Sequence, residues 1–202
     1  MLVGSRMTFP VITAGPLMTL AEALQKIDEN KIHAMPVTDP HGRLLGLVSR
    51  SLLTAAIAEN PANGEKYVED FMERVVLTVT DSTTIEEAAR IILDYDIPLL
   101  PVLQDNFVVG VLTPSQLIRI LIEITGTRQS GVRVTLKLKD RPEQMLKILN
   151  AISELNGNIH SLNTFCGEGM DEKILMFKVE NIDKFVLKQI LTPLSVKLID
   201  IR

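Results

Sequence analysis

Apolar residues recur at helical spacing in the stretch TTIEEAARIILDYD, residues 83–96. Ile85, Ala88, Ala89 and Ile92 would share one face of a helix, because 3.6 residues make one turn. Thr84 stands just before this pattern and Glu87 follows three positions later, which is the spacing of a capping box. The pattern therefore predicts a helix over residues 84–95 with a capping box at its start.

Two short apolar runs follow, at residues 99–103 and 107–113, and they flank the polar stretch QDN. Runs of this length around a short polar turn are typical of a β-hairpin. Pro114 comes next and suits the first turn of another helix, where its missing N–H is not needed. With a short extended piece at the start, the predicted order is strand, helix, strand, strand, helix.

The same order occurs twice, because the chain matches itself when it is shifted by 65 positions. An extra residue in the first hairpin turn then changes the offset to 64. The matched pairs include Met7 and Met72, Thr13 and Thr78, Thr19 and Thr84, Glu22 and Glu87, Ile32 and Ile97, Pro36 and Pro101, and Gly46 and Gly110, while Ser49 meets Thr113. A register kept for so long indicates a duplication, with copies at residues 1–60 and 61–124.

The shared pattern is V.T......T..EA...I.....I...PV, followed by Gly, two apolar residues and Ser or Thr. It resembles the CBS domain, which normally occurs as an intramolecular pair. The resemblance implies that the pair binds AMP, ADP, ATP or S-adenosylmethionine in clefts between strands and helices, and transmits occupancy to an attached domain. Each such ligand would act as an effector, and no fixed cofactor is implied. The expected cleft of the second copy is lined by Thr78, Ile97, Pro98, Leu100, Thr113 and Gln116.

Both copies depart from the pattern of the resembled family at one position. The family carries an Asp there whose carboxylate takes both ribose hydroxyls, whereas this chain has Leu52 in the first copy and Gln116 in the second. Leucine offers no acceptor, and glutamine offers one without the strength that charge adds. We therefore expect the first copy to be degenerate and the second to bind weakly. Ser49 and Thr113 could instead serve only as helix caps, and both roles could hold at once.

The last third of the chain has a different pattern of apolar and polar residues. It begins with the alternating stretch VRVTLKLKD at residue 132. Alternation predicts a strand with Val134 and Leu136 on one face. A helix follows, with Asp140 placed to cap it, Pro142 near its start and Gly157 at its end. Two strands, a helix and a strand complete an α+β, ferredoxin-like βαββαβ domain at residues 132–202, after a linker at 125–131.

This domain resembles the ACT domain, a regulatory module that often binds amino acids, through "D.P" at the first turn and "L.G.NI" after the helix. Family members that bind amino acids usually carry Gly shortly after that Pro, and this chain has Glu143. A carboxylate there suits the helix dipole but repels an incoming anion. We therefore favour a dimerising fold over an amino-acid sensor. A CBS pair followed by an ACT domain resembles the acetoin-utilisation regulatory protein family.

Composition narrows the choice of function. The formal charge is −4, aromatic residues make up 4% and Trp is absent, so neither a basic footprint nor stacking platforms for nucleic acid are present. Residues 1–130 carry 10 Lys and Arg against 16 Asp and Glu, while residues 131–202 carry 11 against 9, which agrees with a domain boundary between them. Cys166 is the single cysteine, so a reducing cytoplasm is expected. No apolar run approaches the ~18 residues that span a bilayer, so no membrane partner is expected.

One cluster could carry chemistry: His160, Cys166, Glu168, Asp171 and Glu172. Its spacing matches no zinc pattern, and Gly167 and Gly169 indicate a solvated hairpin turn. His160 and Cys166 would lie ~20 Å apart along a regular strand, too far to act as a nucleophile pair. We therefore predict neither a metal site nor catalytic residues.

The sequence as a whole predicts a cytoplasmic, non-catalytic sensor that relays effector binding through a homodimer to an unknown regulated protein. The dimer is expected because the segment QLIRILIEI, residues 116–124, is apolar nearly all round and needs cover. Two alternatives stay open, which are a dimerisation scaffold without a ligand and an enzyme that uses residues 160–172.

Overall fold

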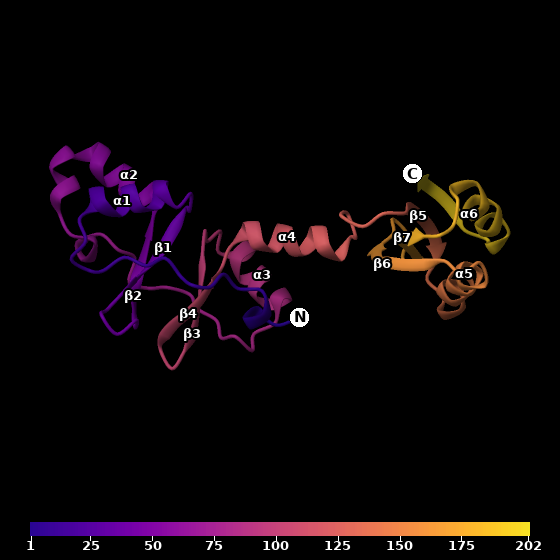
Figure 1. Ribbon diagram of the computed structural model, residues 1–202, viewed down its shortest axis with the longest axis horizontal. Coiled ribbons are helices and arrows are strands. Elements are labelled where there is room, and N and C mark those ends of the chain that lie inside the picture. Colours follow the sequence, from indigo (N-terminus) through magenta and orange to yellow (C-terminus); the bar gives the residue numbers. More distant parts are fainter. The chain divides into compact units, whose positions relative to one another are not determined.

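The computed structural model describes all residues from 1 to 202 and divides into two compact units, residues 1–118 and 119–202 (Figure 1). Helix α4, Pro114–Ile124, begins in the first unit and ends in the second. The predicted linker at residues 125–131 forms the turns between α4 and the first strand of the second unit. No helix of the structure has both the length and the apolar character needed to cross a bilayer.

The first unit contains two copies of one arrangement, in which a helix is followed by a two-stranded antiparallel hairpin and a second helix. The first copy consists of α1 (Leu20–Glu29), β1 (Ala34–Thr38), β2 (Leu44–Ser49) and α2 (Arg50–Glu59). The second copy consists of α3 (Ile85–Asp94), β3 (Leu100–Gln104), β4 (Phe107–Leu112) and α4. The extended piece expected before each first helix is reduced to one parallel bridge, Ala14 with Val37 and Val79 with Val102.

The predicted cap of α3 is confirmed, because Thr84 Oγ1 accepts the N–H of Glu87 at 3.2 Å. The prediction of a full capping box was wrong for α3, where the reciprocal bond from the Glu87 side chain is not formed. The box is complete on α1 instead: Glu22 Oε2 accepts both the N–H and the hydroxyl of Thr19 at 2.9 Å. These bonds, the backbone one first, hold the pKa of Glu22 below its usual value. Nothing in the structure explains why Glu87 differs.

Both hairpins turn where polar residues were expected. Asp105 and Asn106 have positive φ of 51° and 69°, as a two-residue type I′ turn requires. In the other hairpin, Asp39 Oδ1 accepts the N–H groups of His41 and Arg43 at 2.9 and 2.8 Å. The predicted QDN turn is thus confirmed.

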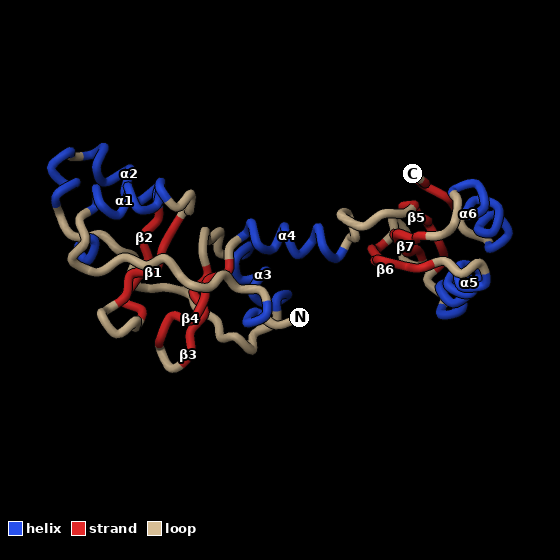
Figure 2. Tube along the Cα trace, in the orientation of Figure 1, coloured by secondary structure: helices blue, strands red, loops and turns tan.

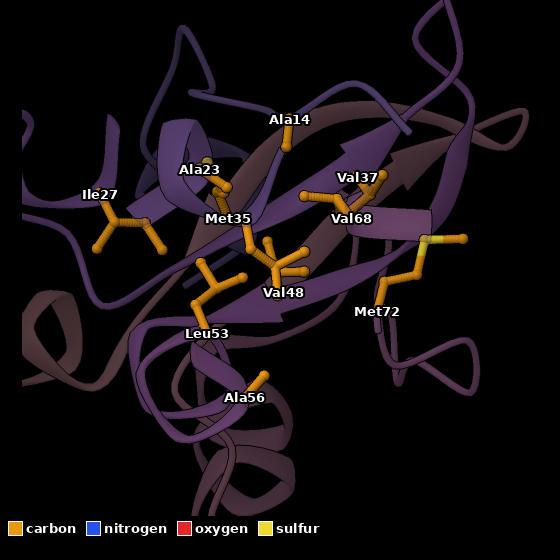
Figure 3. Packing of buried hydrophobic residues seen from close by; sticks show 11 residues of the cluster. Ala14, Ala23, Ile27, Met35, Val37, Val48, Leu53, Ala56, Val68 and Met72 are labelled. Atoms are coloured by element: carbon orange, nitrogen blue, oxygen red, sulfur yellow. The ribbon is translucent and has the colours of Figure 1, made fainter. Parts of the chain in front are cut away.

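Each copy is completed by a segment that precedes the other copy's first helix. We call residues 1–8 the first lead-in and residues 66–73 the second lead-in. Val68 and Met72 of the second lead-in belong to the core of the first copy, where Val68 has no exposed surface (Figure 3). The first lead-in pairs with the second copy, since Val3 N–H donates to Thr83 O at 2.9 Å, just as Val68 N–H donates to Met18 O at 2.8 Å.

The two copies meet through residues that the repeat offset relates to one another. The shared cluster consists of Ala34, Leu47, Leu99 and Val111, with Val11 and Val76 packed against it. These six residues form three equivalent pairs, so the interface between the copies is self-complementary. Arg43 and Phe107 are also an equivalent pair; their backbones form a bridge, and the guanidinium lies 5.6 Å from the ring centre.

The second unit is a four-stranded antiparallel sheet of order β6-β7-β5-β8 with two helices on one face (Figure 2). Its elements are β5 (Val132–Lys139), α5 (Pro142–Glu154), β6 (Asn158–Cys166), β7 (Glu172–Glu180), α6 (Lys184–Leu191) and β8 (Lys197–Ile201). Leu136, Ile148 and Phe177 lie in the core between sheet and helices without exposed surface. The predicted βαββαβ order is confirmed.

Two details of α5 differ from the prediction. Asp140 does not cap the helix; Arg141 takes the cap position without a side-chain bond, and Asp140 Oδ1 pairs with Lys173 Nζ of β7 at 2.8 Å. The left-handed residue after the helix is Asn156, with φ 57°, rather than Gly157. Gly157 is required by packing, because a Cβ there would lie 2.5 Å from Ile182 Cδ1.

Candidate ligand site

Gln116 stands in the first turn of α4, where the resembled family carries its ribose-binding Asp. Its Oε1 accepts the N–H of Thr113 at 2.8 Å and the Thr113 hydroxyl at 3.1 Å. Its Nε2 donates to Thr8 Oγ1 at 2.7 Å and to Arg6 O at 3.2 Å. A side-chain amide has two donor and two acceptor positions, so all four are occupied. Gln116 has no spare acceptor for a ribose.

The other residues predicted for this cleft lie in different surroundings. Leu100 has no exposed side-chain surface, because it lies in the core at the start of β3. Thr78 is exposed and Ile97 is half-buried. The structure thus brings Thr113 and Gln116 together by hydrogen bonds, while Pro98 lines a hollow with residues of the first copy.

That hollow lies along α2 and has a volume of about 540 Å³. Its size is within the range of small-molecule pockets, roughly 300–1,000 Å³. The lining residues are His33, Ser49, Arg50, Ser51, Thr54, Ala55, Ala58 and Pro98. His33 and Pro98 are equivalent by the repeat offset, so the hollow takes one residue of this pair from each copy.

Hydroxyl groups supply much of the polarity of this hollow. Ser49 Oγ accepts the N–H of Leu52 at 3.2 Å and lies 3.0 Å from Ser51 Oγ. Arg50 is engaged elsewhere: its Nε lies 2.7 Å from Asp28 Oδ1, and this hydrogen bond raises the Arg50 pKa. The hollow therefore offers hydroxyl donors and acceptors beside an arginine that is already paired.

The sequence predicts a degenerate first copy, yet this hollow lies along its helix α2. Leu52, on which that prediction rests, packs against the core of the first copy, as Phe71 does. The overlooked signal is one helical face, on which Ser51 and Thr54 are followed by the small residues Ala55 and Ala58. Small side chains at this spacing leave room beside a helix.

The residues of the second unit that were considered for chemistry lie in two separate places. His160 Nε2 lies 3.1 Å from Glu180 Oε2, and the hydroxyl of Ser130 donates to Glu180 Oε1 at 2.7 Å. These bonds, that of Ser130 first, lower the Glu180 pKa. Exposed Cys166 lies in another hollow, of about 320 Å³, beside Glu168 and Glu172.

The carboxylate of Glu172 is paired, because it lies 2.6 Å from Lys137 Nζ and this contact lowers its pKa. The structure contains no group of three or more His, Cys, Asp or Glu arranged to hold a metal ion. The turn predicted at Gly167 and Gly169 is present between β6 and β7.

The family model described as "CBS domain" matches residues 3–59 and 68–123, which together exceed half of the chain. The chain belongs to the CBS-domain family. Both matched ranges begin with a lead-in valine, Val3 and Val68, so the family repeat includes the segments that complete the opposite copy.

Curated relatives of this CBS pair include proteins with different names. The L-aspartate semialdehyde sulfurtransferase of Methanocaldococcus jannaschii is 30% identical over 55% of the chain and 21% of its own length. The chloroplastic CBS domain-containing protein CBSX1 of Arabidopsis thaliana is 31% identical over 58% of the chain and 61% of its own length. The chain thus spans less than two thirds of these relatives.

Solved CBS pairs share the fold over about 60–65% of the chain. A Vibrio cholerae protein assigned to acetoin utilization (AcuB) is 26% identical, with TM-score 0.59 over 65% of this chain and 98% of its own. CBSX2 in complex with AMP is 32% identical, with TM-score 0.56 over 61% and 97%. The CBS pair of protein MJ0100, in complex with 5-methylthioadenosine and S-adenosyl-L-methionine, is 29% identical, with TM-score 0.55 over 60% and 95%.

Proposed function

We propose that the protein is a regulatory module whose CBS pair binds an adenosine effector, AMP or S-adenosylmethionine before ADP or ATP. The observation that carries the proposal is the CBS-pair fold, two of whose solved neighbours hold AMP or S-adenosyl-L-methionine. AMP is favoured over ATP because residues 1–130 sum to −6, and added phosphates raise the repulsion. A ligand that binds only the folded state raises the melting temperature, so a thermal-shift screen with these compounds tests it.

The site within the pair is proposed in the second copy, around Thr113 and Gln116, with the hollow along α2 as its rival. Gln116→Asp supplies a charged acceptor for two ribose hydroxyls, and we expect AMP affinity to rise about tenfold by calorimetry. Leu52→Asp is the matched control in the first copy and should help less. If Gln116→Asp changes nothing while Leu52→Asp strengthens binding, the rival hollow is the site.

The effector signal is proposed to pass through a homodimer to a regulated protein in the cytoplasm. Helix α4 leaves Ile118, Leu121 and Ile124 exposed by 58%, 57% and 46%, spaced three residues apart. Such a stripe is more apolar than a free helix normally shows to water. A sedimentation experiment that finds only monomer at micromolar concentration would refute the dimer.

The second unit is proposed to be an ACT-like domain that binds no amino acid. Glu143 lies in the first turn of α5, where a carboxylate ligand would need positive charge and free N–H groups. Titration of free amino acids should give no heat, and Glu143→Gly should regain weak binding. Clear binding by the unmodified protein would contradict this.

The alternatives to a sensor are a scaffold without a ligand and an enzyme that uses residues 160–172. Two contacts disfavour the enzyme, because His160 pairs with Glu180 and Glu172 pairs with Lys137. Metal analysis and the thermal-shift screen separate the three. A nucleotide shift supports the sensor, a tightly held metal supports the enzyme, and neither result leaves the scaffold.

A further inference from the structure

The two lead-ins are held to the CBS pair by the same backbone bonds but by different side chains. Thr8 exchanges two backbone bonds with Val111, at 2.8 and 3.2 Å, and Glu73 exchanges two with Leu47, both at 2.9 Å. Val3 and Val68 anchor the two lead-ins and are both fully buried. The backbones therefore dock in equivalent ways.

The side chains beyond these anchors are apolar in the first copy and polar in the second. Leu52 and Phe71 pack against the core of the first copy. The equivalent positions in the second copy are Gln116 and Arg6, and there the Gln116 amide donates to Arg6 O and to Thr8 Oγ1. Apolar packing resists a polar competitor, whereas a ligand hydroxyl can replace a hydrogen bond. In the second copy the lead-in is held by side-chain hydrogen bonds, which are the kind of contact that a polar ligand can replace.

We propose that Gln116 is a latch, formed by its bonds to Thr113, Arg6 and Thr8, which an effector opens when its ribose takes the Gln116 carbonyl. The proposal rests on the adenosine binding proposed above. Because Oε1 already accepts two bonds from Thr113, a ribose hydroxyl must displace at least one of them and turn the amide. The amide then loses its alignment with Thr8, and the first lead-in loosens from α4.

The latch also makes the second copy selective. A ligand that lacks one ribose hydroxyl gains fewer hydrogen bonds at Gln116 and opens the latch less. A nucleoside with an intact ribose can form hydrogen bonds with Gln116 in place of those that Gln116 makes in the latch. The 2′-deoxy form of AMP therefore serves as a probe that should bind less tightly and open the lead-in less.

Two variants break the latch from opposite sides. Gln116→Glu keeps an acceptor for Thr113 but removes both donors to the lead-in. Thr8→Val keeps the shape of Thr8 and removes its Oγ1. Hydrogen exchange on the full chain should show exchange at residues 2–8 rise on the order of tenfold in each variant. Residues 66–73 are the internal control, and Glu73→Gln, at the position equivalent to Thr8, should change neither segment.

The ligand arm uses AMP and its 2′-deoxy form on the unmodified protein. Saturating AMP should raise exchange at residues 2–8, and Thr8→Val should bind AMP several-fold more tightly because one of the hydrogen bonds of the latch is already absent. If AMP binds but exchange at residues 2–8 is unchanged or lower, the link to the ligand is overturned and the proposed function stands. If no adenosine compound binds, the proposed function falls together with that link. If neither variant alters exchange without ligand, the latch itself is refuted.

Discussion

The two copies of the CBS repeat share one backbone plan and differ in what closes them. In the first copy the partly buried Leu52 and Phe71 pack against the apolar core, whereas in the second copy Gln116 donates a hydrogen bond to Thr8 Oγ1. The first copy keeps a hollow of about 540 Å³ along α2. Two copies of one fold thus keep the same backbone docking, while the side chains at the equivalent positions pack against an apolar core in one copy and form hydrogen bonds in the other.

The largest expected difference between the copies comes from their equivalent glycines. A Cβ at Gly46 would lie 2.7 Å from the backbone oxygen of Glu73, which is fixed by its bond to Leu47, while a Cβ at Gly110 would meet the flexible side chain of Met7. Gly46→Ala should lower the free energy of unfolding by about 3 kcal/mol. Gly110→Ala should cost less than half of that. Urea denaturation followed by circular dichroism measures both free energies of unfolding. Equal losses for the two variants would contradict the expected difference between the copies.

Exchanging the equivalent residues Leu52 and Gln116 should give the next largest difference between the copies. Leu52→Gln places a polar amide where Leu52 packs against the apolar core of the first copy, which should cost about 2 kcal/mol. Gln116→Leu removes the hydrogen bonds to Thr113, Arg6 and Thr8. Water can bind the groups that these bonds leave free, so the substitution should cost about 1 kcal/mol. Thermal unfolding of both variants checks the order, and a larger loss for Gln116→Leu would contradict it.

The helix caps give a smaller difference that depends on pH. Thr19→Ala and Thr84→Ala should each cost about 1 kcal/mol. The hydrogen bonds from Thr19 lower the pKa of Glu22 below its usual 4.5, so this carboxylate stabilises the fold above that pH and the contribution is lost as pH falls through the lowered pKa. Glu22→Gln should therefore destabilise at pH 7 but not at low pH.

Glu87→Gln is the control for this prediction, because Glu87 lacks the reciprocal bond. Its loss of stability at pH 7 should be smaller than that of Glu22→Gln. Unfolding curves at several pH values compare the two variants. A pH-independent loss for Glu22→Gln would show that the box contributes no charge-dependent stability.

The smallest expected effect on the free energy of unfolding concerns the contact between Arg43 and Phe107, which joins equivalent positions of the two copies. Arg43 lies over Phe107, and the repeat offset relates the two positions. Arg43→Ala or Phe107→Ala should each cost about 0.5 kcal/mol. The double exchange Arg43→Phe with Phe107→Arg should restore the contact if the copies are equivalent around it. A double variant as unstable as the sum of both losses would speak against that equivalence.

Local patterns predicted the elements well because their causes are local. The apolar period of α3, the Thr84 cap and the polar residues at 105–106 all act within a few positions. The opposite docking of the lead-ins is not local. The sequence shows that Val3 and Val68 are apolar. Because the two copies have similar sequences, the pattern does not say which copy each valine completes.

The candidate site was harder to predict for the same reason. The departure at Gln116 was visible from the repeat, but its satisfied amide depends on Thr8, 108 positions away. The hollow along α2 depends on the space that Ala55 and Ala58 leave beside other elements. Neither property follows from the spacing of residues along one helix.

The opposite docking of the lead-ins has a consequence for synthesis on the ribosome. Thr8 must wait for Gln116, 108 positions later, which at about 5–20 residues per second is roughly 5–20 s. Met72, which belongs to the core of the first copy, is made much earlier. Between the completion of α2 and the emergence of the second lead-in, that core lacks Val68 and Met72, and the lead-in already made is the one that docks on the second copy. For a short interval during synthesis, therefore, the first copy is complete up to α2 while the first lead-in, which docks on the second copy, is the lead-in available to it.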